Sequence, residues 1–100
     1  MTSKLETLAT TKFAPQQFIQ EGSWGLRTLQ GKHESTMTLY RWTGGTPFIE
    51  WDIPGLNEVE HIGLELEGKR VVGYDGVMSF PRPAYKWLRS LGYTIARDVI

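Results

Sequence analysis

The chain contains no cysteine, and this absence removes several classes of protein at once. Disulfide scaffolds, thiolate zinc sites and cysteine nucleophiles all need a thiol group. An excess of charge of one sign is also missing, because Lys and Arg number 11 and so do Asp and Glu. A protein whose main task is to wrap nucleic acid is strongly basic, so the balanced charge argues against that class.

Long apolar runs are absent as well. No stretch approaches the roughly 20 apolar residues that a membrane-spanning helix needs. Residues 1–13 lack the apolar centre of a secretory signal. These two features predict a cytoplasmic location and no contact with a membrane.

Residues that carry chemistry are scarce. The only histidines are His33 and His61, no serine lies in a strained Gly-x-Ser-x-Gly turn, and the glycines of residues 68–76 fit no phosphate-binding or dinucleotide motif. We therefore predict no catalytic residue, no cofactor and no enzymatic activity. One alternative stays open, a small metal-dependent hydrolase in which His61 joins carboxylates of neighbouring strands, namely Glu50, Asp52 or Glu65.

What the sequence does contain is a series of turn and strand signals. Glu67-Gly68 and Asp75-Gly76 are typical hairpin turns. Short runs of β-branched, aromatic and alternating apolar residues predict strands at 36–43, 48–53, 59–67, 69–74 and 77–80, with further strands at 24–30 and 94–100. Residues 32–35 are predicted to be a polar connection. Gly73, inside a predicted strand, indicates a bulge or the close approach of another side chain.

Two helices are predicted. In the first, Pro15 suits an initial helical position and Gly22 suits a C-terminal cap, which predicts a short helix over residues 13–22. In the second, Pro81 or Pro83 begins a helix that ends before Gly92. Its apolar stripe is expected to pack on the sheet, against Ile62, Leu64 and Leu66, and consists of Ala84, Trp87, Leu88 and Leu91.

These elements predict an α+β fold in a single domain. Strands precede a helix instead of alternating with helices, which favours a mostly antiparallel sheet of about five or six strands covered by the C-terminal helix. The domain is expected to include residues 13–100, with residues 1–12 forming either a flexible tail or an edge strand.

Two sets of residues are candidates for binding a partner. Alternation within 36–43 places Thr38, Tyr40 and Trp42 on one strand face, so Tyr40 and Trp42 are exposed if the helix covers the other face. The second set is Arg82, Lys86 and Arg89, which share one face of the C-terminal helix. Charge is also segregated, since no Lys or Arg occurs between Arg41 and Lys69, a region that contains six acidic residues.

The leading hypothesis from these features is a small, non-enzymatic binding module of a prokaryotic or viral kind. It would dock a sheet face or edge onto another protein or onto its own copy. The alternative is a nucleic-acid-binding protein that uses the basic helix face. The metal-dependent hydrolase is the second alternative.

Overall fold

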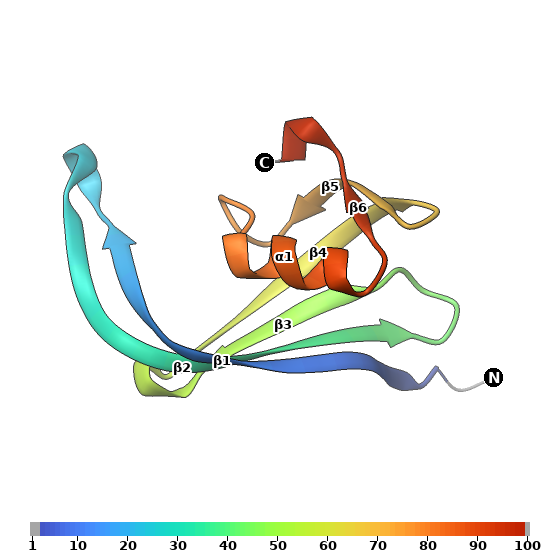
Figure 1. The fold of residues 1–100 in the computed structure, drawn as a ribbon, viewed down its shortest axis with the longest axis horizontal. Helices are drawn as coiled ribbons and strands as arrows, with labels where there is room; N and C mark the ends of the chain where they lie inside the picture. The colour runs from blue at the N-terminus through green and yellow to red at the C-terminus, as the bar shows by residue number, and fades with distance from the viewer. Residues whose placement is uncertain (1–2, 100) are drawn as a thin grey trace.

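Six strands form one sheet in which they lie in the same order as in the chain (Figure 1). The computed structural model describes residues 3–99. The strands are β1 (Leu5–Glu21), β2 (Arg27–Trp42), β3 (Phe48–Ile53), β4 (Glu58–Glu67), β5 (Arg70–Asp75) and β6 (Thr94–Ile95). All neighbouring pairs are antiparallel except β5 and β6, which are parallel. The predicted single domain with a mostly antiparallel sheet and a C-terminal helix is confirmed.

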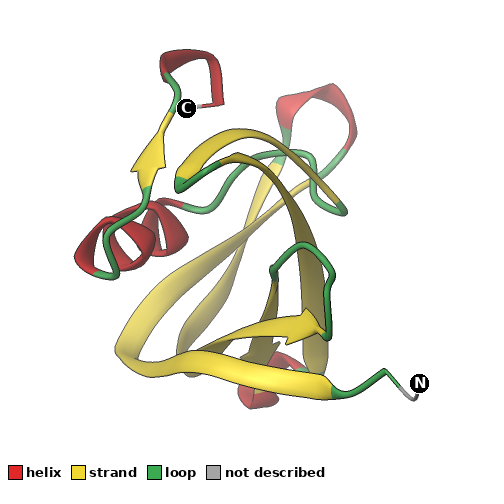
Figure 2. Cartoon of the chain, turned by 90° about the vertical axis from the view of Figure 1, so that its right-hand side faces the viewer, coloured by secondary structure: helices red, strands yellow, loops and turns green. Residues whose placement is uncertain are grey.

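The sheet is curled (Figure 2). Alternation of apolar and polar residues along its central strands builds the core on one of its faces. In β2, Met37 and Leu39 are buried, whereas the residue after each of them, Thr38 and Tyr40, remains partly accessible to solvent. Ile49 and Ile53 repeat this pattern in β3, as do Ile62 and Leu64 in β4. Side chains separated by two residues lie on one face of a strand, so these residues meet in a common apolar cluster.

Helix α1 (Arg82–Ser90) is the only α-helix within residues 3–99. Its buried residues are Ala84, Trp87 and Leu88, and they belong to the same cluster as the core residues of the sheet. The end of the helix is a Schellman motif, because the N–H of Gly92 donates to the Arg89 carbonyl and the N–H of Tyr93 donates to the Leu88 carbonyl. The predicted helix and its glycine cap are thus confirmed. No helix in the part of the chain described here is long and apolar enough to cross a membrane.

The helix predicted at residues 13–22 does not form, and that prediction is wrong. Residues up to Glu21 continue strand β1, which pairs with β2 along most of its length. Pro15 lies at an irregularity in the pairing between Phe13 and Gln16, on an edge strand, where its missing N–H removes no ladder bond. Gly22 marks the hairpin turn, with its N–H donating to the Leu26 carbonyl.

Other element boundaries also differ from the predictions. Residues 32–35 are not a connection, because β2 runs unbroken from Arg27 to Trp42. The strand predicted from residue 24 begins only at Arg27, since Ser23–Gly25 forms a 3-10 turn, η1. Residues 77–80 form no strand, and the chain bends at 77–79. The last predicted strand is reduced to β6, after which Arg97–Val99 forms a 3-10 turn, η3, and residue 100 lies outside the described range.

Strands β1 and β2 extend well beyond the rest of the sheet. They pair from Leu5↔Trp42 to Glu21↔Arg27, whereas β2 pairs with β3 only over Thr36–Tyr40. The remainder, residues 16–33, is a two-stranded hairpin that bends away from the body of the molecule, and we call it the hairpin arm (Figure 1). Two bulges near the base of the arm increase local twist and bending: one places an extra residue in β1 between Phe13 and Gln16, and the other places one in β2 between Leu29 and Lys32.

Candidate interaction surfaces

The outer face of the sheet, opposite the core, carries a strip of aromatic side chains. Tyr40 of β2 lies directly opposite Phe48 of β3, with their ring centroids 5.8 Å apart. The Phe48 ring is 6.4 Å from the imidazole of His61 on β4. Trp42, two residues after Tyr40 on the same face, is 51% exposed. We call Tyr40, Trp42, Phe48 and His61 the aromatic strip.

Carboxylates lie beside this strip. Glu50 Oε1 is 3.9 Å from His61 Nε2 on the neighbouring strand. The carboxylate of Asp75 lies across Gly63, and that of Glu65 lies across Gly73, so closely that a Cβ at either glycine would overlap it. The close approach predicted at Gly73 is therefore confirmed, as is a register shift beside it. The glycines leave room for acidic side chains to lie flat on the outer face.

The sequence located part of this surface. The predicted alternation places Tyr40 and Trp42 on the strand face opposite Met37 and Leu39, and the burial of Met37 and Leu39 confirms that alternation. The contributions of Phe48 and His61 were missed. They join the strip through the register of β2 with β3 and of β3 with β4, which no short-range signal in the sequence encodes.

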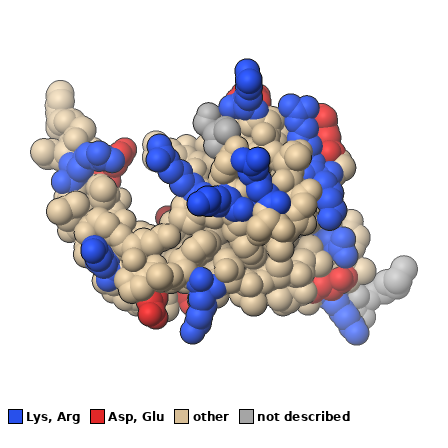
Figure 3. Space-filling view, viewed as in Figure 1, with Lys and Arg blue, Asp and Glu red and all other residues tan. Residues whose placement is uncertain are grey.

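The basic residues of helix α1 form a separate surface. Arg82, Lys86 and Arg89 are all exposed and project from the helix away from its buried stripe. Arg89 lies over the Tyr85 ring, 5.5 Å from its centroid. None of the three forms an ion pair with an acidic residue of the described chain. Figure 3 shows many Lys and Arg groups and few acidic groups on the side of the molecule from which Figure 1 is viewed.

The residues proposed for a metal site are only partly brought together. Glu50 and His61 are cross-strand partners, but Asp52 lies opposite Val59 and Glu65 lies opposite Gly73. Within residues 3–99 no group of three or more His, Asp or Glu side chains is arranged to hold a metal ion. The geometry therefore gives the hydrolase hypothesis no support.

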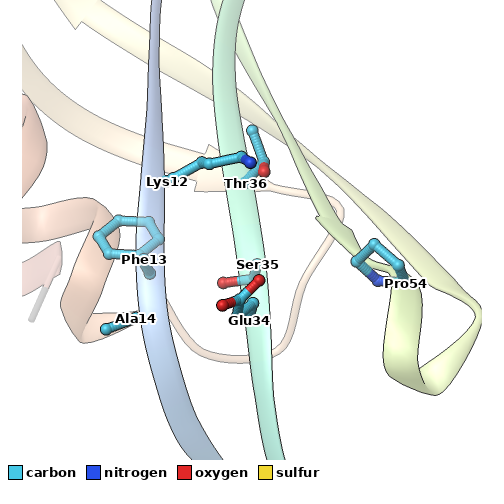
Figure 4. Close-up of a pocket in the computed structure, with 7 residues that line it drawn as sticks. All are labelled: Lys12, Phe13, Ala14, Glu34, Ser35, Thr36 and Pro54. Atoms are coloured by element: carbon cyan, nitrogen blue, oxygen red, sulfur yellow. The ribbon is translucent and has the colours of Figure 1, made fainter.

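A small pocket lies at the base of the hairpin arm, where β1 and β2 pass Pro54 (Figure 4). Its volume is about 290 Å³, and Ser35 in its lining is buried with no hydrogen-bond partner for Oγ within residues 3–99. His33 is directed elsewhere: its Nε2 donates to the Gln30 carbonyl over 2.7 Å, and its ring packs closely on Gly55. The pocket has the polar groups to hold a small molecule or water, and among the described residues no side chain that could act as a base is hydrogen-bonded to Ser35 Oγ.

Comparison with known proteins adds no assignment. The chain matches no protein-family model, and neither curated proteins nor solved structures show significant similarity to it. Any function must therefore be inferred from the surfaces themselves.

Proposed function

We propose that this chain is a small, non-enzymatic protein-interaction module that binds a partner protein through the outer face of its sheet. The observation that supports this proposal is the aromatic strip, which stays partly open to solvent on the sheet face opposite the core. Tyrosine and tryptophan combine a large apolar area with a polar group and few rotatable bonds, so they dominate binding energy at many interfaces. Here Tyr40 and Trp42 lie two residues apart on one strand face.

The composition of this face indicates the chemistry of its partner. Glu50, Glu65 and Asp75 lie on the same side as the aromatic strip. A partner with an apolar centre for the rings and Lys or Arg around it would match both features. The acidic groups would act mainly on the rate of association and on partner choice, while the rings would supply affinity.

Affinity capture from the native host would test the proposal. The tagged wild-type protein, the double variant Tyr40→Ser/Trp42→Ser and the variant Lys86→Ala would be compared by mass spectrometry. We expect a protein retained by the wild type and by Lys86→Ala but lost from the double variant. Lys86 is a suitable control because it is exposed on the separate basic surface. A partner that depends on Lys86 and not on Tyr40 and Trp42 would contradict the proposal.

Nucleic-acid binding through helix α1 is a second candidate, favoured by the three exposed cations that have no acidic partner within residues 3–99. Cations grouped on a helix face can contact successive phosphates. The balanced total charge limits the strength of such binding. The cytoplasmic location stays a prediction, and fractionation of the native host would check it.

A further inference from the structure

The tip of the hairpin arm exposes an unusual amount of apolar surface. Trp24 is 98% exposed, Leu26 68% and Leu29 70%. Trp24 also has a φ of 62°, in the left-handed region that bulky side chains rarely adopt. A strained backbone that presents a fully solvated indole is costly in an isolated molecule, and such outliers are concentrated at functional sites.

The arm also lacks a core of its own. Beyond its base, residues of β1 and β2 pair only with each other, and Ile19 faces Leu29 across the hairpin with both side chains exposed. An isolated two-stranded hairpin is only marginally stable in water. Packing of the arm against another protein surface would stabilise the strand pairing and would bury the apolar side chains of the tip.

A groove of suitable character lies between the arm and the body of the molecule. Figure 3 shows this hollow, and its volume is about 580 Å³. Its apolar lining comes from Phe18 and Ile19 on the arm and from body residues that include Trp51, Leu56, Val77 and Met78, with Met78 fully exposed. Glu58 and Glu60 add negative charge on the body side, and neither forms an ion pair with a described cation.

We propose that the groove receives the hairpin arm tip of a second copy of this chain. The apolar residues of the tip match the apolar lining, and Arg27 at the tip would meet the carboxylates of Glu58 and Glu60. Among residues 3–99, the one ion-pair partner of Arg27 is Glu21, at 3.6 Å, and both side chains are solvent-exposed, so this pair is weak enough to be exchanged. Each chain carries both a tip and a groove, so a dimer with two-fold symmetry contains two identical contacts, with the tip of each copy in the groove of the other. The dimer is therefore closed. We call this arrangement the clasp.

This dimer rests on the proposed role as an interaction module but uses a different surface from the aromatic strip. Sedimentation velocity over a wide range of protein concentrations would test it. We expect the wild type to reach the mass of a dimer, and Trp24→Asn to weaken dimerisation at least about tenfold. Asparagine tolerates the left-handed backbone, so this variant should remain folded. Trp42→Asn, which alters an exposed tryptophan of the aromatic strip, is the matched control and should dimerise like the wild type.

Reciprocal variants separate a clasp from other dimers. Trp24→Asn damages the tip and Met78→Asp damages the groove, so each variant alone should dimerise at least about tenfold more weakly than the wild type. Their mixture should recover a heterodimer, because one intact tip can enter one intact groove. Since the chain has no cysteine, a disulfide between Trp24→Cys and Met78→Cys chains, absent with Trp42→Cys in place of Trp24→Cys, would locate the contact.

The proposal is overturned by a wild type that stays monomeric at all concentrations, or by a dimer that Trp24→Asn leaves intact. A dimer lost in Trp42→Asn but not in Trp24→Asn would assign self-association to the aromatic strip, which overturns the clasp and leaves the proposed interaction function standing. Conversely, loss of partner capture by the Tyr40→Ser/Trp42→Ser variant does not depend on the arm. The two proposals can therefore fail separately.

Discussion

At the scale of single residues, the four tryptophans show how little residue type alone determines. Trp87 is buried in the core, Trp51 is half-buried against Phe18, Trp42 is half-exposed on the outer face, and Trp24 is almost fully solvated. Their intrinsic hydrophobicity is the same, so the differences come from the elements that carry them. Only the tertiary arrangement distinguishes a tryptophan of the core from one available to a partner.

Two glycines of the outer sheet region make a testable contrast. Gly76 has a φ of 92°, and a Cβ there would collide with the His61 backbone carbonyl. Gly63 has an ordinary strand backbone, and its Cβ would meet only the flexible carboxylate of Asp75. We expect Gly76→Ala to lower the free energy of unfolding by more than about 2 kcal/mol, from left-handed strain plus a backbone clash.

Gly63→Ala is the control and should change stability by less than about 1 kcal/mol, because Asp75 can move and alanine is favoured over glycine within a strand. Urea titrations of both variants would measure the difference. Equal losses would show that the turn at Gly76 is not held in its left-handed conformation.

At the scale of elements, helix α1 depends on the sheet. Its nine residues are too few to form a stable helix alone in water, so packing must hold it. Leu88 has no accessible surface and lies in the same cluster as Ile62 and Leu64. That the helix covers the sheet remains a prediction, and the energetic dependence of the fold on Leu88 tests it.

We expect Leu88→Ala to destabilise the protein by roughly 2–5 kcal/mol, since it removes a fully buried side chain and leaves a cavity. Lys86→Ala, on the exposed face of the same helix, should stay within about 0.5 kcal/mol of the wild type. Denaturant unfolding followed by circular dichroism gives both values. A more damaging Lys86 variant would mean that the basic face is involved in packing.

The segment at residues 13–22 shows why an element can be misassigned. Pro15 and Gly22 stand at spacings typical of a helix start and stop, and a short segment of this kind cannot be distinguished from an edge strand by its own residues. Its partner, β2, supplies the backbone hydrogen bonds that decide the matter. A helix at residues 13–22 is incompatible with a hairpin arm. The predicted elements therefore did not indicate that Trp24, Leu26 and Leu29 form an exposed surface.

At the scale of the whole molecule, charge separates into surfaces although its total is zero. The basic helix face offers Arg82, Lys86 and Arg89, whereas Glu50, Glu65 and Asp75 belong to the outer face of the sheet. Such separation promotes selective association with an oppositely charged surface more than it promotes tight binding to a polyanion.

This arrangement predicts no retardation of unrelated DNA or RNA at physiological ionic strength. If three helix cations each neutralise one phosphate, the slope of log affinity against log salt is roughly −2.7, or about a 40-fold loss over an approximately fourfold rise in salt. Gel-shift titrations at several salt concentrations measure it. Binding that persists at physiological salt and weakens in Arg82→Ala, Lys86→Ala and Arg89→Ala would favour the nucleic-acid alternative over the protein-interaction module.

The local sequence determined those elements whose residues favour a single backbone conformation. The alternation of Met37 and Leu39 with Thr38 and Tyr40, and the glycine that caps helix α1, follow from strand period and from left-handed backbone preference. Tertiary structure alone decided the pairing of residues 13–21 with β2, the register that brings Phe48 and His61 beside Tyr40, and the groove beside the arm. These features join residues far apart in the chain, and the energy of such contacts exists only once the strands have paired.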